Sequence, residues 1–156
     1  MIIKHTPKKR WGQNFLIDPN ISRKIVSSID IKPDDHILEI GPGAGSITTL
    51  MAKRAKKVTA VEIDSDLCEI LKNKNISNLE IINGDILKTN LSSISFNIIV
   101  GNLPYYITTP ILFKILKSKI EWGKIFFLMQ KEVADRIVGK PNTKSYGRLT
   151  IMTQIL

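Results

Sequence analysis

Asn102-Leu103-Pro104-Tyr105 contains the residue types best suited to chemistry on a nucleic-acid base. The exocyclic amine of an adenine is a poor nucleophile, because its lone pair is delocalised into the ring. The Asn102 side-chain oxygen and the Leu103 carbonyl, held in place by the fixed φ of Pro104, could accept hydrogen bonds from both N–H groups and expose that lone pair to a methyl group. The ring of Tyr105 offers a flat face on which a flipped base could stack. Asn102, Leu103, Pro104 and Tyr105 are therefore the candidate catalytic residues.

Three glycines on alternate positions, Gly41, Gly43 and Gly45, directly follow the apolar run at residues 36–40. Glycine tolerates positive φ and lets backbone N–H groups approach a ligand closely. Apolar residues at helical spacing come next, so the stretch predicts a strand, a glycine turn and a helix. A doubly wound α/β sheet receives a nucleotide-like ligand at such a turn. Ser46 stands where a dinucleotide fingerprint requires glycine or alanine, and an ordinary tight turn remains the alternative for the glycines alone.

Two acidic residues follow further predicted strands. Glu62 lies 17 positions past Gly45, close to the spacing at which a carboxylate reaches ribose hydroxyls, and a carboxylate can accept two hydrogen bonds from a vicinal diol. Asp85 follows the strand predicted at residues 79–83 and could accept a hydrogen bond from the exocyclic amine of an adenine. Gly84-Asp85 is also a common turn sequence, so both interpretations of Asp85 stay open.

The candidate residues follow stretches whose apolar patterns predict parallel strands with helices between them. Strands are expected at residues 36–40, 57–62, 79–83, 96–100 and 125–129. Capping signals place helix starts at Asp18-Pro19, with Ile21, Ile25 and Ile29 as the buried stripe, at Asp64 and at Thr109-Pro110. Further helices are expected at residues 130–138 and 149–156. The sequence therefore predicts an α/β fold with a mostly parallel, doubly wound sheet.

Composition narrows the class of protein. The chain has 156 residues, enough for one domain with a substantial core. Its 23 basic and 14 acidic residues give a net charge of +9, which favours a polyanionic partner such as nucleic acid or serves solubility alone. The single cysteine, Cys68, excludes an internal disulfide and suits a reducing compartment. No stretch has the apolar length of a membrane span or a signal peptide, so we expect a cytoplasmic protein, and no metal site is expected.

Basic residues gather in two places that could contact a nucleic acid. Residues 1–17 form a basic arm in which Lys8, Lys9 and Arg10 lead into aromatic residues, a mixture that suits a nucleic-acid contact or a lid over a ligand. For the arm up to Lys9, a solvated tail is the alternative. The second place is the loop predicted at residues 139–147, which a basic surface loop would also explain. The candidate RNA contacts there are Lys140, Lys144 and Arg148.

Taken together, these motifs resemble the KsgA/RsmA-type ribosomal RNA adenine dimethyltransferases. The glycines preceded by an acidic residue look like the first motif of S-adenosylmethionine-dependent methyltransferases, and the matching motifs follow the family's order over essentially all 156 residues. They are Arg10-Trp-Gly-Gln-Asn-Phe-Leu16, Glu39-Ile-Gly-Pro-Gly-Ala-Gly45, Val61-Glu62, Gly84-Asp85, Asn102-Leu-Pro-Tyr105, Gln130-Lys-Glu-Val133 and Tyr146-Gly-Arg-Leu149. By this likeness, the cofactor-binding residues would be Asn14, Leu16, Gly41, Gly43, Glu62, Asp85 and Asn102.

The resemblance implies a Rossmann-like class I fold with S-adenosyl-L-methionine as cofactor. It implies dimethylation of N6 of two adjacent adenines near the 3′ end of small-subunit (16S) ribosomal RNA, in ribosome biogenesis. Residues 1–17 would form the arm and cofactor lid, and residues 18–156 the methyltransferase domain. Two alternatives stay open: an Erm-type enzyme that dimethylates one adenine of large-subunit ribosomal RNA, and a non-catalytic factor that binds pre-ribosomal RNA.

The family continues with two more strands and a small helical domain, so this chain looks truncated after its fifth strand and helices. The strand at residues 125–129 should then be an uncovered edge, and such edges associate. We therefore expect the fragment to self-associate, to bind S-adenosylmethionine weakly and to methylate ribosomal RNA poorly or not at all, and we expect the full-length protein to be monomeric.

Overall fold

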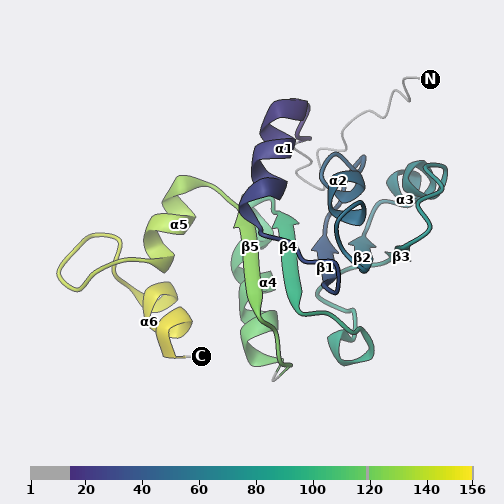
Figure 1. Cartoon of the computed structure of the whole chain (residues 1–156). Helices are drawn as coiled ribbons and strands as arrows, with labels where there is room; N and C mark the ends of the chain where they lie inside the picture. Colours follow the sequence, from purple (N-terminus) through teal and green to yellow (C-terminus); the bar gives the residue numbers. More distant parts are fainter. Residues whose placement is uncertain (1–14, 119, 156) are drawn as a thin grey trace.

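The computed structural model describes residues 15–118 and 120–155, except for the side chain of Tyr105. Five parallel strands form one sheet in the order β3-β2-β1-β4-β5 (Figure 1). The strands are β1 (His36–Ile40), β2 (Lys57–Glu62), β3 (Leu79–Asn83), β4 (Ile98–Asn102) and β5 (Lys124–Leu128). The order reverses between β1 and β4, which is where a doubly wound sheet opens a crevice at the carboxyl ends of its strands. The predicted α/β fold is confirmed.

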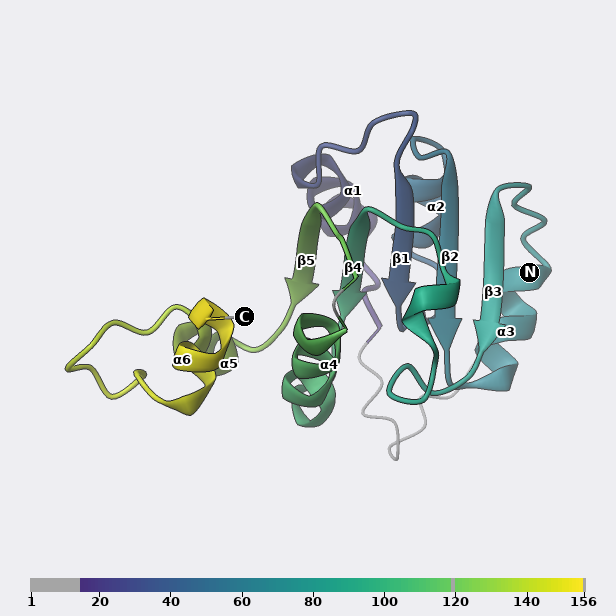
Figure 2. The same cartoon turned by 90° about the horizontal axis from the view of Figure 1, so that it is seen from below.

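Helices cover both faces of the sheet. They are α1 (Pro19–Ser28), α2 (Thr48–Ala52), α3 (Ser65–Lys72), α4 (Tyr105–Lys117), α5 (Lys131–Ile137) and α6 (Arg148–Ile155), with a 3₁₀ turn, η2 (Leu91–Ser93). Apolar residues of α1 and α2 pack on one face of the sheet, and those of α4 and η2 pack on the other. The helices α5 and α6 lie beyond β5, to one side of the sheet (Figures 1 and 2).

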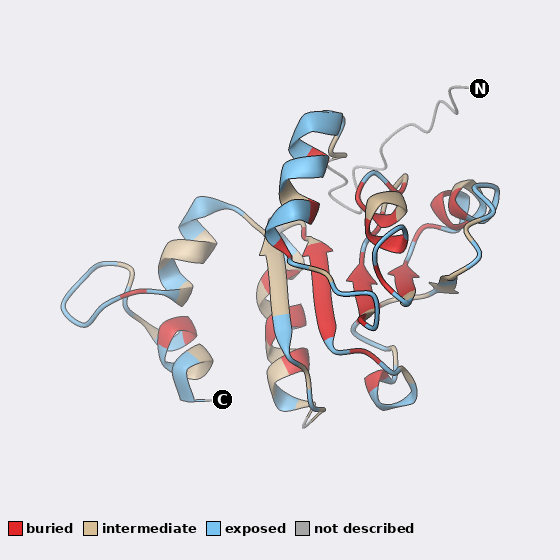
Figure 3. Cartoon of the chain, in the orientation of Figure 1, coloured by how far each residue is buried: buried red, intermediate tan, exposed pale blue. Residues whose placement is uncertain are grey.

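The two apolar clusters explain why the inner strands are hydrophobic at nearly every position. Ile37 points into one cluster and Leu38 into the other, because successive strand residues face opposite sides of a sheet. Figure 3 shows β1, β2 and β4 mostly buried, whereas β5 is only half-buried. The site-bearing ends of β1, β2 and β4 therefore sit on a rigid, well-packed base.

The start of β4 differs from its prediction. The strand was predicted at residues 96–100, and it begins instead at Ile98. Asn97 ends the preceding connection: its side-chain oxygen accepts a hydrogen bond from the His36 amide at 2.8 Å, and its side-chain nitrogen donates to Asp35 at 2.7 Å. Its carbonyl accepts from the amides of Gly123 and Lys124. Asn97 thus ties together the amino ends of three strands.

Helix α4 also differs from its prediction. It begins at Tyr105 rather than at Thr109-Pro110, and Pro110 lies inside the helix. The φ of Pro104, −59°, already suits a helix start, and the Pro104 carbonyl accepts hydrogen bonds from the Ile107 amide and the Thr108 hydroxyl. Both Pro104 and Thr109-Pro110 could mark a helix start in the sequence, and the structure begins the helix after Pro104.

The inner face of α1 matches the prediction in part. Asp18 caps the helix as predicted, and its side chain accepts a hydrogen bond from the Asn20 amide. Of the predicted stripe, Ile29 is fully buried and Ile25 packs partly buried against the core, whereas Ile21 is 47% exposed. Ser22 and Val26 are the buried residues inside the helix. Helical spacing alone could not decide which side of the stripe faces the sheet.

Candidate active site

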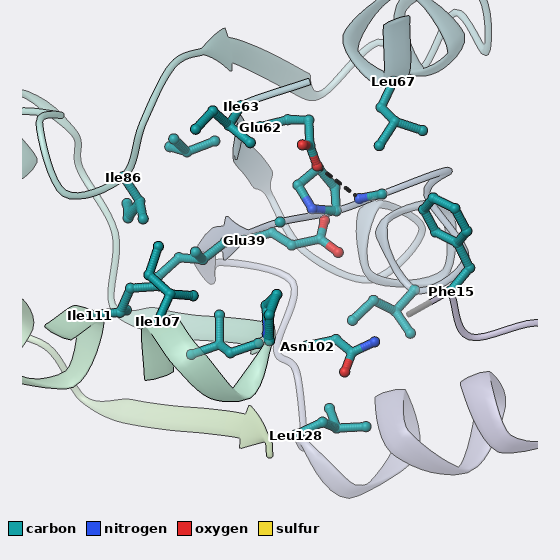
Figure 4. A pocket seen from close by; sticks show the side chains of 18 of the residues that line it. Phe15, Glu39, Glu62, Ile63, Leu67, Ile86, Asn102, Ile107, Ile111 and Leu128 are labelled. Atoms are coloured by element: carbon teal, nitrogen blue, oxygen red, sulfur yellow. Dashed lines mark hydrogen bonds between the residues drawn. The ribbon is translucent and has the colours of Figure 1, made fainter. Parts of the chain in front are cut away.

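A cavity of about 270 Å³ opens at the carboxyl ends of β1, β2 and β4. Figure 4 shows the side chains of Glu39, Glu62 and Asn102 converging on it from these three neighbouring strands. Phe15 closes another side (Figure 4), and Leu16 also lines the cavity. Polar groups gathered over an apolar floor at a topological switch point are typical of a nucleotide-like ligand site.

The three glycines of the turn after β1 all have positive φ, +67° at Gly41, +59° at Gly43 and +82° at Gly45. A Cβ at Gly45 would meet the Leu71 side chain of α3 at 2.6 Å, so this glycine allows close helix packing. A Cβ on Gly43 would meet the Phe15 ring at 3.2 Å, and one on Gly41 would meet nothing within 4 Å. The turn is thus a tight turn and also a wall of the cavity.

Glu62 ties this glycine turn to β2. Its carboxylate accepts hydrogen bonds from the Gly43 amide at 3.1 Å, drawn as a dashed line in Figure 4, and from the Asp64 amide at 2.9 Å. Burial raises the pKa of Glu62, and these amides oppose the rise. The sequence predicted the placement of Glu62, which lines the cavity, but gave no sign that it also holds the turn in shape.

Glu39, at the fourth position of β1, is a site residue that was not among the candidates. Only 1% of its surface is exposed, it lines the cavity, and neither of its carboxylate oxygens has a hydrogen-bond partner among the described residues. Burial raises the pKa of Glu39 to about 8. The nearby Glu62 charge adds to the rise, and the Thr48 hydroxyl opposes it. The only sequence signal for Glu39 was its position two residues before Gly41, the first glycine of the turn.

The Asn102-Leu103-Pro104 turn forms the β4 side of the cavity, and all three residues line it. Asn102 is the last residue of β4. The Leu103 amide donates a hydrogen bond to the Leu128 carbonyl at 3.0 Å, and its side chain is buried. Both sides of the Leu103 carbonyl are therefore constrained, by this bond and by the Pro104 ring. The structure does not describe the Tyr105 side chain. Tyr106, which is 48% exposed, supplies an aromatic ring to the cavity wall.

Asp85 follows β3 and lines the cavity. One of its carboxylate oxygens accepts a hydrogen bond from the Leu87 amide at 2.9 Å, and its carbonyl accepts from the amides of Lys88 and Thr89. The turn interpretation of Asp85 is thus confirmed. Contact with the amine of an adenine remains a prediction, and the position of Asp85 at the cavity is compatible with it.

Comparison with known proteins decides the family. Residues 4–156 match the family described as Ribosomal RNA adenine dimethylase. This chain belongs to that family. The Ribosomal RNA small subunit methyltransferase A of Leuconostoc mesenteroides is 46% identical over 94% of this chain and 53% of that protein. The protein of the same name from Geobacillus kaustophilus is 48% identical over 94% of this chain and 54% of that protein. The chain spans about half the length of the curated relatives it matches.

Solved structures agree with the family assignment. A dimethyladenosine transferase from Plasmodium falciparum superposes with a TM-score of 0.80 at 33% identity, over 90% of this chain and 52% of that one. The 23S rRNA methyltransferase ErmE superposes with a TM-score of 0.71, also at 33% identity, over 90% of this chain and 55% of that one. The fold of this chain is therefore the Rossmann-like fold of these methyltransferases.

Of the N-terminal candidate residues, Leu16 lies in the part of the chain that the structure describes. Asn14, Lys8, Lys9 and Arg10 lie outside the described residues. Leu16 lines the cavity, and its carbonyl accepts a hydrogen bond from the Ser46 hydroxyl at 2.8 Å. The chain leading into α1 is thus fastened to the glycine turn just where the cavity needs a wall.

The basic candidates of the C-terminal part lie apart from the cavity. Lys140, Lys144 and Arg148 are exposed on the loop between α5 and α6 and on the first residue of α6, beyond β5 (Figure 1). The loop is fastened by Thr150, whose hydroxyl accepts a hydrogen bond from the Gly147 amide at 3.2 Å and donates to the Arg136 carbonyl. The structure therefore separates these cations from the cavity and places them on a surface of their own.

Within the described residues, no helix is long and apolar enough to cross a bilayer. The same residues contain no cluster of three His, Cys, Asp or Glu side chains that could hold a metal ion.

Proposed function

We propose that this chain contributes the cofactor and base-activating sites of a ribosomal RNA adenine N6-dimethyltransferase. The observation that carries the proposal is the placement of the Asn102-Leu103-Pro104 turn in the wall of the same cavity as Glu62 and the glycine turn. Acceptors for an amine and a site for a nucleotide-like ligand thus share one space. The family to which the chain belongs supports the reaction class.

The residues of the cavity suit S-adenosyl-L-methionine, which when bound supplies an electrophilic methyl group. Glu62 can accept hydrogen bonds from ribose hydroxyls with the lone pairs that the Gly43 and Asp64 amides leave available. The acidic Glu39 suits the positive charge of that cofactor, because its oxygens have no other partner among the described residues. The residues that would hold the cofactor are Asn14, Leu16, Gly41, Gly43, Glu62, Asp85 and Asn102.

The base-activating step falls to the β4 turn. The Asn102 side-chain oxygen and the Leu103 carbonyl would each accept one N–H of the adenine amine, which draws the nitrogen toward tetrahedral geometry. Acceptors fixed in advance cost no reorganisation during the reaction, and the bond from Leu103 to Leu128 fixes one of them. Tyr105 would stack on the base. Once the nitrogen is methylated, it carries a positive charge and passes one proton to the solvent. In the second transfer the amine has one N–H left, which one of the two acceptors would bind.

The proposed substrate is a pair of adjacent adenines near the 3′ end of small-subunit (16S) ribosomal RNA, modified during ribosome biogenesis in the cytoplasm. The relatives named for the small subunit are 46% and 48% identical to this chain, whereas ErmE, named for 23S rRNA, is 33% identical. This difference favours the small subunit over an Erm-type target. The basic residues Lys140, Lys144 and Arg148, with Lys8, Lys9 and Arg10, would contact the RNA backbone.

Radiolabelled methyl transfer tests the proposal. The chain is incubated with labelled S-adenosylmethionine and either small ribosomal subunits from methylation-deficient cells or isolated large-subunit RNA. Weak label on adenines near the 3′ end of the small-subunit RNA is the expected result, because this chain spans about half the length of the curated relatives that it matches. Label only on large-subunit RNA would favour the Erm-type alternative, and RNA binding without label would favour a non-catalytic assembly factor.

A further inference from the structure

Glu39 is a carboxyl group buried in the wall of a ligand cavity with no ionic or hydrogen-bonding partner among the described residues. Buried carboxylates are normally paired or well hydrogen-bonded, because an ionised group without partners is costly to bury. The described residues therefore leave the hydrogen-bonding capacity of this carboxyl group unused.

Among the residues that the structure describes, the cavity around Glu39 has no positively charged side chain in its lining. Its partners in the sheet register are Ala60 in β2 and Val100 in β4, both apolar. The group that acts on it from α2 is the Thr48 hydroxyl, and the charged group that acts on it is Glu62, another acid. The glycine turn contributes no charged side chain to the cavity wall, and the β4 turn contributes the Asn102 amide.

The free protein therefore holds Glu39 in its neutral, protonated form. Its pKa of about 8 places most of the population in this form at pH 7. A cationic ligand changes the balance, because it supplies the opposite charge that the carboxylate lacks.

We propose that binding of a positively charged ligand in this cavity expels a proton from Glu39, so that the carboxylate pairs with the ligand and the proton passes to the solvent. The step breaks one O–H bond and forms one ion pair, with no change in oxidation state. The inference rests on the proposed function, which names S-adenosylmethionine, with its sulfonium and ammonium groups, as that ligand.

Proton-linked binding has a direct calorimetric signature. S-adenosylmethionine is titrated into the chain at pH 7 in phosphate, HEPES and Tris, whose ionisation enthalpies differ, and the slope of binding enthalpy against buffer enthalpy counts the protons released. The ligand amine also titrates in this pH range, so the quantity of interest is the release by the wild type minus that by Glu39→Gln. This difference should be about 0.9 proton per bound ligand at pH 7 and about 0.1 at pH 9, from the fraction of Glu39 protonated before binding.

Two matched variants assign the proton. Glu39→Gln has the same shape and cannot ionise, so only the release that comes from the ligand amine should remain. Glu80→Gln removes an exposed carboxylate of β3 that lies outside the cavity, and release should equal that of the wild type. A difference below about 0.3 proton between the wild type and Glu39→Gln at pH 7 would overturn the inference.

Carboxyl ¹³C NMR gives a second, independent reading, with Glu39→Gln identifying the resonance. Without ligand the Glu39 signal should titrate near pH 8, and with saturating S-adenosylmethionine it should stay at the ionised position from pH 6 to 9. A signal at the neutral position in the complex would overturn this inference but not the proposed function. Absence of any binding to the folded chain would overturn the proposed function as well, so the two failures can be told apart.

Discussion

The cavity region and the region beyond β5 are held together by different forces. The strands β1, β2 and β4 are buried along nearly their whole length between two apolar clusters. In contrast, β5 is half-buried and α5 has no fully buried residue. In this outer region the threonines Thr150 and Thr153 bond to backbone carbonyls of α5. The dense packing of the cavity region can hold the carboxyl group of Glu39 in place without a partner among the described residues. The outer region needs no such precision for the RNA backbone contacts proposed for its basic residues.

The largest expected difference between the two regions is in how a carboxylate of each region affects the pH dependence of stability. Native Glu39 keeps a proton that the unfolded chain releases above its ordinary pKa of 4.5, so the free energy of unfolding falls as pH rises from about 5 to about 8. Between these pH values, Glu39→Gln should gain on the order of 3 kcal/mol relative to the wild type. Urea unfolding at four pH values measures this. Glu132→Gln on exposed α5 is the control, and parallel curves for wild type and Glu39→Gln would contradict the raised pKa.

Asn102→Ala tests the β4 turn as a catalytic element. We expect methyl transfer to fall about 10²-fold or more, because an oriented acceptor in the transition state is lost. Affinity for S-adenosylmethionine should stay nearly unchanged, because Asn102 is one of seven residues that would hold the cofactor. Single-turnover transfer and calorimetry measure the two quantities. Gln154→Ala, at an exposed position of α6, is the control from the outer region. Equal losses of affinity and rate would show that Asn102 only binds the cofactor.

Glu62→Ala tests the ribose interpretation. Affinity for S-adenosylmethionine should weaken by about 1.5–3 kcal/mol, the value of hydrogen bonds to a charged acceptor. The loss includes the support that Glu62 gives to the Gly43 amide. Glu80→Ala breaks the surface ion pair with Lys57 and a long hydrogen bond from the Thr59 hydroxyl, both outside the cavity, and should leave affinity unchanged. A folded Glu62→Ala variant with wild-type affinity would refute the assignment.

Thr150→Val should have the smallest effect and a local one. It leaves the Gly147 amide and the Arg136 carbonyl without their shared partner, which should cost about 1 kcal/mol of stability. Hydrogen exchange should rise at residues 139–147 and stay unchanged at the cavity. Gln154→Ala, at an exposed position of the same helix, is the control. A change at the cavity in Thr150→Val would show that the regions are coupled.

The sequence predicted the sheet better than the details of the site. Bounds of β1, β2 and β3 match the prediction, because short apolar runs between turn residues leave little choice. The placement of Glu62, Asp85 and Asn102 at one cavity followed from the rule that parallel strands end at the same edge. These are properties of local pattern and topology.

The missed features depend on tertiary contacts. Glu39 sits in an apolar strand, and only the packed sheet shows that its carboxyl group lines the cavity without a partner. Neither the bond from Glu62 to Gly43 nor the tie made by Asn97 has a signal in the local sequence. Ile21 was assigned to the wrong face, because helical spacing fixes a stripe but not its direction.

The tie made by Asn97 also bears on how the chain folds. Its side chain joins Asp35 and His36, which lie 62 and 61 positions earlier, and its carbonyl joins Gly123 and Lys124. These bonds can form only after two long chain loops have closed. We therefore expect them to form after the folding transition state, whose free energy includes the entropy cost of closing the loops. Asn97→Ala should accordingly speed unfolding and leave the refolding rate nearly unchanged, which stopped-flow chevron analysis would detect. The Asn97 contacts, at the end of the sheet opposite the cavity, would then form late in folding and break early in unfolding, so that they slow the unfolding of the native state.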